Sequence, residues 1–153
     1  FRVALGNRLY GCDDCQAVCP KNEGPYSIAL AAPQRDSEVD IVELLDCTDE
    51  ELMETYGHWY IPRRRPEYLR RNALVVLGNV GSSSDPEVER VLKASLDSSS
   101  PLVRSHAVWA ACRLGKERLV ESRMADGLLE DDPDGFVASE LAACGISPAL
   151  DIP

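Results

Sequence analysis

The stretch that decides the fold lies at residues 66–78 and reads PEYLRRNALVVLG. Its apolar residues recur at the three- and four-residue intervals of a helix, which predicts a helix over about 67–78. A related sequence returns 34 positions later, where LRRNA at 69–73 lines up with VRSHA at 103–107. A third copy, FVASE at 136–140, follows about 33 positions further on. Helices that repeat at this period predict an α-solenoid.

Four more helices are predicted downstream, over about 86–96, 101–114, 116–130 and 133–144. Three of them share one type of start, in which an N-cap residue precedes a proline at the first helical position: Asp85 with Pro86, Ser100 with Pro101, and Asp132 with Pro133. Small residues allow each of the repeated helices to pack closely on its neighbour: Ala73, Ala107, Ala110, Ala111, Ala142 and Ala143. The spacing alone fits several helical repeats, but the Val-Arg pair and the alanines favour a HEAT-like one.

The first part of the chain has a different organisation. Residues 1–33 are interrupted by glycines and prolines and are predicted to form loops and turns. A helix is predicted over 37–46, and a second over about 49–56, where Thr48 and Glu51 form a capping box and Gly57 ends the helix. We therefore divide the chain into a segment at 1–33, an acidic helical linker at 34–60 and a helical repeat domain at 61–153.

Three cysteines occur in GCDDCQAVCP at 11–20, with the spacing C-x2-C-x3-C-P. This spacing equals the last three positions of the ferredoxin-type run that binds [4Fe–4S] clusters, with Leu9 in place of the first cysteine. Cys12, Cys15 and Cys19 are therefore candidate ligands of an incomplete iron–sulfur site. A zinc site is the alternative, with His58 or His106 as a fourth ligand. Pro20 and the surrounding residues favour iron–sulfur.

The other cysteines, Cys47, Cys112 and Cys144, lie in apolar helical patterns and are expected to pack in the core. Trp109 is also expected in the core. His106 occupies the repeat position of Asn72 and is expected at the surface or between helices.

The net charge of −10 argues against a general nucleic-acid binder, yet the charge is unevenly distributed. Acidic residues dominate 35–59 and 116–153, whereas 60–72 holds a basic cluster: Arg63, Arg64, Arg65, Arg70 and Arg71. Such a local cluster can bind phosphates near a helix N-terminus, or it can pair with the acids of 36–54. Trp59 and Tyr60 precede the cluster and either offer a stacking face to bases or pack under the solenoid.

In combination, these motifs resemble one family, the epoxyqueuosine reductases of tRNA modification. The resemblance rests on LGNRLYGCDDCQAVCP at 5–20, IPRRR at 61–65, LRRNA at 69–73 and LGN at 77–79, in this order. It implies an enzyme that uses cobalamin and two [4Fe–4S] clusters to reduce the epoxide of epoxyqueuosine, giving queuosine at the wobble position of tRNA. Lys21 departs from the family pattern, which commonly has Trp there.

The resemblance also implies roles for individual residues. Cys12 and Cys15 would bind one cluster and Cys19 the other, with the remaining ligands upstream of Phe1. The backbone of Cys12 and Asp13 would contact cobalamin, and the five arginines would contact the backbone of the tRNA anticodon stem-loop. The catalytic acid and the cobalamin domain would also lie upstream, so no catalytic residue is predicted in this chain, which alone would be inactive.

The sequence thus predicts an all-α fold, with an irregular ferredoxin-like iron–sulfur segment followed by a short HEAT-like α-solenoid. No signal peptide and no apolar run of transmembrane length is visible, and clustered thiols favour a reducing compartment. We therefore expect a cytoplasmic monomer that is a C-terminal piece of a longer enzyme and that receives electrons from a donor protein. The alternative is a non-catalytic HEAT-like interaction module whose ferredoxin-like or zinc-bound cap serves as an electron carrier or scaffold.

Overall fold

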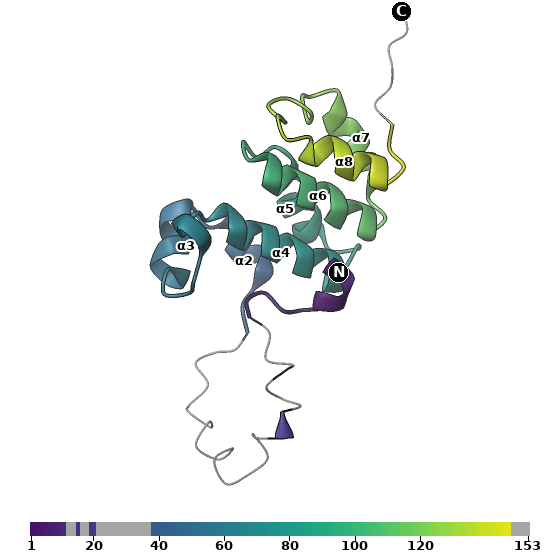
Figure 1. Ribbon diagram of the computed structural model, residues 1–153. Helices are drawn as coiled ribbons and strands as arrows, with labels where there is room; N and C mark the ends of the chain where they lie inside the picture. The colour runs from purple at the N-terminus through teal and green to yellow at the C-terminus, as the bar shows by residue number, and fades with distance from the viewer. Residues whose placement is uncertain (12–14, 16–18, 21–37, 148–153) are drawn as a thin grey trace, which may run out of the picture.

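The computed structural model describes residues 1–11, 15, 19–20 and 38–147. These residues form helices and no strands, which confirms the predicted all-α fold (Figure 1). None of the described helices is both long and apolar enough to cross a membrane. The elements in chain order are η1 (Arg2–Leu5), α2 (Ile41–Asp46), α3 (Asp49–Tyr56), η4 (Pro62–Arg64), α4 (Glu67–Val80), α5 (Pro86–Leu96), α6 (Pro101–Arg113), α7 (Glu117–Met124) and α8 (Phe136–Ala143).

The three repeated helices, α4, α6 and α8, lie side by side in one layer, with α6 packed between the other two (Figure 1). Helices α5 and α7 pack behind this layer, and α2 packs against α4 and α5. Buried positions recur at a constant spacing of 34, at Leu69, Val103 and Val137. The predicted alignment of the third copy, which began at Phe136, is therefore wrong by one residue, and Phe136 is exposed.

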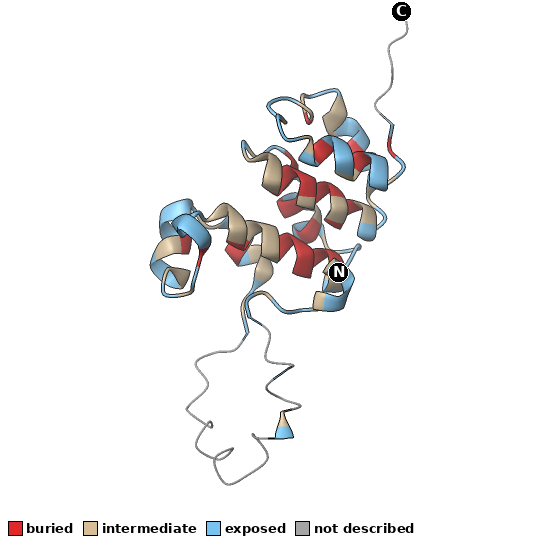
Figure 2. Ribbon diagram, in the orientation of Figure 1, coloured by how far each residue is buried: buried red, intermediate tan, exposed pale blue. Residues whose placement is uncertain are grey.

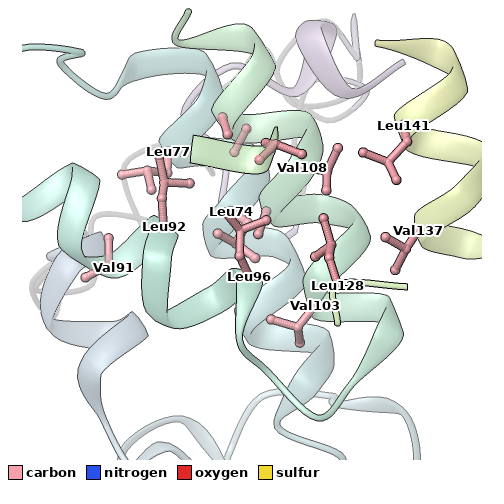
Figure 3. Packing of buried hydrophobic residues seen from close by; sticks show 14 of the residues in the cluster. Leu74, Leu77, Val91, Leu92, Leu96, Val103, Val108, Leu128, Val137 and Leu141 are labelled. Carbon is pink, nitrogen blue, oxygen red and sulfur yellow. The ribbon is translucent and has the colours of Figure 1, made fainter. Parts of the chain in front are cut away.

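The main hydrophobic core fills the space between these two layers (Figures 2 and 3). Aliphatic side chains from α4, α5, α6 and α8 point into it, and Leu128 closes it from the turn after α7 (Figure 3). The labelled members of this core are Leu74, Leu77, Val91, Leu92, Leu96, Val103, Val108, Leu128, Val137 and Leu141. Burial of this apolar surface is the main force that stabilises the solenoid.

Helices α4 and α6 approach each other closely at Gly78. A Cβ atom at this position would lie 2.6 Å from the ring of Trp109 and 3.0 Å from the Cα of Ala110, so only glycine fits. Ala110, like the other small residues of α4 and α6, is fully buried, as the prediction of close helix packing requires. Ala142 and Ala143 are exposed, so the same prediction is wrong for the last helix.

The predicted bounds are confirmed for α3 and α5, including the capping box of Thr48 and Glu51. Helices α4 and α6 differ from the prediction by two residues and one residue. The predicted helix over 37–46 begins only at Ile41. The reason is that the carboxylate of Asp40 accepts hydrogen bonds from the amides of the first turn, which fixes the helix start there.

The prediction is wrong for the last two helices, which are both shorter than 116–130 and 133–144. After Met124 the chain turns through Gly127, with φ of 96°, and Asp131, with φ of 47°. Both are left-handed conformations that end a helix. Asp132 still caps α8, but from a distance: its carboxylate accepts hydrogen bonds from the amides of Val137 and Ala138, both at 3.0 Å.

Candidate functional site

The structure describes two of the three cysteines of the motif at residues 11–20. Cys15 is exposed, Cys19 is half-buried, and both thiols are free. Cys12, Asp13, Asp14 and Lys21 lie outside the described residues. Thiolates at this spacing are the donors that iron–sulfur clusters use, so the chemistry of the two described side chains fits such a group.

Two asparagines of α4 hold the segment that leads to the cysteines. The amide nitrogen of Asn72 donates to the carbonyl of Leu9 at 3.1 Å. The amide nitrogen of Asn79 donates to the carbonyls of Arg2 and Gly6, each at 2.9 Å. Residues seven positions apart lie on one face of a helix, so the two side chains together fix how residues 1–9 lie along α4 (Figure 1).

Two further contacts of Arg2 attach this segment to the solenoid. Its guanidinium forms a bidentate ion pair with Glu140 of α8, with both distances 2.8 Å. It also lies over the ring of Trp109, 5.3 Å from the centroid. Trp109 is therefore half-buried and packs against the edge of the core, whereas the sequence predicts that it lies inside the core.

An aromatic stack joins the same segment to the chain before the basic cluster. Tyr10 stacks on Trp59, with centroids 4.8 Å apart and planes at 11°, and Tyr56 packs on the same indole. The hydroxyl of Tyr10 accepts a hydrogen bond of 2.7 Å from the amide of Tyr60. Tyr10 precedes Cys12 by two residues in the sequence, so this contact holds the residues just before the cysteine motif against Trp59 and Tyr60.

The prediction for Trp59 and Tyr60 offers two alternatives, stacking on bases or packing under the solenoid, and the two residues differ in burial. Trp59 packs, although its partner is the N-terminal segment and not the underside of the solenoid. Tyr60 is 81% exposed.

Arg63, Arg64 and Arg65 form an exposed turn between the stack and α4, and we call these three residues the arginine turn. Arg63 and Arg64 have positive φ values of 54° and 52°. Arg64 donates to the carbonyl of Gly57 at 3.2 Å, and Arg65 pairs with Glu67 at 2.6 Å while its side chain stays 52% exposed. Arg63 has no ion pair or hydrogen bond to any described residue.

The other two arginines of the basic cluster are used inside the fold. Arg70 donates to the carbonyls of Leu45 at 3.0 Å and Cys47 at 2.6 Å, which caps the end of α2, and pairs with Asp49 at 2.9 Å. This ion pair is the predicted contact with the acidic segment. Arg71 donates to the side-chain oxygen of Asn72 and lies over the ring of Tyr68.

The two histidines lie in different settings. His58 is exposed and contacts Trp59 edge-on, with centroids 5.7 Å apart. His106 lies mostly buried, as predicted for an inter-helix residue, with Nδ1 2.9 Å from the carbonyl of Leu102. The pKa of His106 is lowered to about 4, mainly by burial and in part by the charges of Arg2 and Arg71, against the opposing effect of the hydrogen bond with Leu102.

We expect the free energy of unfolding to decrease as the pH falls from 7 to 5. His106 stays neutral in the folded chain down to about pH 4, whereas in the unfolded chain it takes up a proton near pH 6.5. The unfolded state therefore binds more protons in this window, and the free energy of unfolding falls by about 2 kcal/mol. Urea unfolding at both pH values measures this, and a His106→Asn variant, which can still donate to Leu102, should lose less stability. An equal loss in both proteins would contradict this explanation.

The sequence predicts that Cys47, Cys112 and Cys144 pack in the core. They do pack against the hydrophobic clusters, but they lie half-buried at the edges. Burial raises the pKa of the Cys112 thiol, and the neighbouring Cys144 raises it further. Cys112 therefore stays protonated and behaves as a small apolar side chain.

The structure also reveals residues that the sequence analysis missed as contributors to the site. Tyr10 gave no signal beyond its position near the cysteines. Asn72 and Asn79 did give a sequence signal. Two amides seven residues apart on one face of an apolar helix need hydrogen-bond partners when they are buried.

The described residues thus define an all-helical protein whose helix α4 holds the segment that leads to the cysteine motif. No protein-family model matches the chain. It is 30% identical over 144 residues to an uncharacterised protein of Geobacillus stearothermophilus, covering 92% of this chain and 65% of that protein. It is 36% identical over 126 residues to an epoxyqueuosine reductase of Staphylococcus aureus, covering 76% of this chain and 31% of that enzyme.

A solved structure also shows similarity to epoxyqueuosine reductases. The crystal structure of an epoxyqueuosine reductase with an epoxyqueuosine-modified tRNA stem-loop matches with a TM-score of 0.70 and 26% identity, over 95% of this chain and 40% of that one. The chain belongs to the epoxyqueuosine reductase family. It spans about a third of the length of the Staphylococcus aureus enzyme.

Proposed function

We propose that this chain is the cluster-bearing and tRNA-binding part of an epoxyqueuosine reductase, which reduces epoxyqueuosine to queuosine in tRNA. One observation supports this proposal: the stack of Tyr10 on Trp59, with the hydrogen bond from the Tyr60 amide, holds the residues just before the cysteine motif against the residues just before the arginine turn. A redox group and a phosphate-binding surface would then lie next to each other, as an oxidoreductase that acts on RNA requires. The names of the relatives support the same reaction.

The cysteines would share two [4Fe–4S] clusters with ligands from the rest of the protein. Cys12 and Cys15 would bind one cluster and Cys19 the other, and the backbone of Cys12 and Asp13 would contact cobalamin. When bound, these groups supply the electrons for the reduction. Asn72 and Asn79 contribute by holding the preceding segment in place. A cytoplasmic location, a monomeric state, an electron donor and the three-part division of the chain remain predictions.

The arginine turn would bind phosphates of the anticodon stem-loop. Its three guanidiniums are exposed, and Arg63 has no partner among the described residues, so this charge is available to an anion. Arg70 and Arg71 are engaged with carbonyls and side chains of the fold. We therefore propose that Arg70 and Arg71 stabilise the fold next to the arginine turn and that the three exposed arginines contact the phosphates. Phosphate contacts of this kind position the RNA and do not read its bases.

Replacing Arg63, Arg64 and Arg65 together by alanine should weaken binding of an anticodon stem-loop and make it less sensitive to salt. Each lost phosphate contact lowers the slope of log K against log salt by about one unit, so a decrease of about two to three is expected. Fluorescence anisotropy across a salt series measures this in the complete natural protein. Arg118→Ala is the matched control, because Arg118 is exposed on α7, away from the turn. An unchanged slope in the triple variant would refute the phosphate role.

A further inference from the structure

Tyr60 differs from the other aromatic residues around it. The rings of Tyr10, Tyr56 and His58 all contact Trp59, whereas the side chain of Tyr60 is 81% exposed. Its backbone is held, because its amide donates to the hydroxyl of Tyr10. A large aromatic ring on a fixed backbone loses little entropy when a partner binds it.

The surroundings of Tyr60 indicate what kind of partner would bind. Arg63 follows it by three residues, and the whole arginine turn is exposed beside it, on a protein whose net charge is −10. The other exposed large apolar residues outside this region, Phe1, Val3, Val80 and Phe136, have no such cluster of arginines within three residues. A partner that meets both an aromatic face and several guanidiniums must combine an unstacked planar ring with phosphate groups. Single-stranded regions of RNA have both features.

We propose that the ring of Tyr60 is a stacking platform for an unpaired nucleobase of the RNA whose backbone the arginine turn binds. This inference rests on the proposed function and adds the residue that selects unpaired over paired RNA. A base in a duplex has both faces covered by its neighbours, whereas a loop base can present one face to a tyrosine ring. Every base has such a face, so the contact tolerates base identity and carries no direct sequence reading.

The test compares Tyr60→Ala with Tyr60→Phe in the complete natural protein. Two RNA probes are used: an anticodon stem-loop, and a duplex of the same stem without unpaired bases. Tyr60→Ala should weaken stem-loop binding about tenfold, since stacking contributes that much per base, and should leave duplex binding unchanged. Tyr60→Phe keeps the ring and should bind the stem-loop within about twofold of the parent protein. Phe136→Ala removes a half-exposed ring from α8 and serves as the matched control.

The salt series separates this inference from the proposed function. The phenol ring is uncharged, so Tyr60→Ala should leave the salt slope unchanged while the arginine variants lower it. If Tyr60→Ala binds the stem-loop as tightly as the parent while the arginine variants bind weakly, stacking is refuted and the proposed function stands. If the parent binds neither RNA, both are refuted. If Tyr60→Ala weakens loop and duplex binding equally, the selection of unpaired bases is refuted.

Discussion

Replacing Arg104 by alanine should lower the free energy of unfolding by about 3 kcal/mol, because the carbonyls of two turns, one buried and the others partly buried, lose their shared donor. Arg104 is 6% exposed and lies at the start of α6. Its guanidinium joins the turn before α6 to the turn after α7. It donates to the carbonyls of Ser98 at 2.8 Å, Ser99 at 3.1 Å, Leu128 at 3.1 Å, Asp131 at 3.3 Å and Glu130.

Urea unfolding followed by circular dichroism measures the effect. Arg113→Ala is the matched control, because Arg113 is an exposed arginine of the same helix and should change stability little. Arg104→Lys should be intermediate, since one ammonium cannot contact both turns at once. If the Arg104→Ala protein is as stable as the control variant, the two turns do not depend on this side chain.

The second large effect is expected for Asn79→Asp. The aspartate has nearly the same shape but no amide hydrogens, so the carbonyls of Arg2 and Gly6 lose their donor and face a carboxylate. We expect a loss of about 2–3 kcal/mol, concentrated in residues 1–11. Hydrogen exchange should show faster exchange of the amides of Ala4, Gly6 and Arg8, while amides of α6 remain protected.

Asn7→Ala is the control for this variant, because Asn7 is an exposed asparagine of the same segment. Because this segment leads directly to the cysteine motif, the Asn79→Asp protein should also retain less iron if the proposed clusters are bound there. Unchanged exchange in residues 1–11 would show that Asn79 does not hold the segment.

The repeat explains why much of the fold could be predicted from the sequence. Arg70 and Arg104 stand 34 residues apart, and both donate to carbonyls at the ends of neighbouring elements. The helices that begin at Pro86 and Pro101 start where the N-cap and proline signals place them. The same signal at Asp132 and Pro133 failed, because left-handed turns at Asp131 and Gly135 delay the helix and Asp132 caps it from five residues away.

The site could be predicted only in part. The sequence identified the cysteines and the arginines as separate groups, since each has a local pattern. It could not show that Tyr10, just before the cysteines, stacks on Trp59, just before the arginines, because that contact connects residues about fifty positions apart. Nor could it separate Arg70 and Arg71, which serve the fold, from the exposed arginine turn, since all five have the same charge and differ only in their surroundings.

The most direct test of the account is anaerobic iron and acid-labile sulfide analysis of the complete natural protein, with an EPR spectrum before and after cobalamin is added. The account predicts about eight irons and about eight sulfides per chain, as two [4Fe–4S] clusters require, and a cob(II)alamin signal after the addition. It also predicts that Cys15→Ser and Cys19→Ser each lose iron, whereas Cys47→Ser retains it. One zinc and no sulfide would contradict the account and indicate a structural metal cap on a helical scaffold.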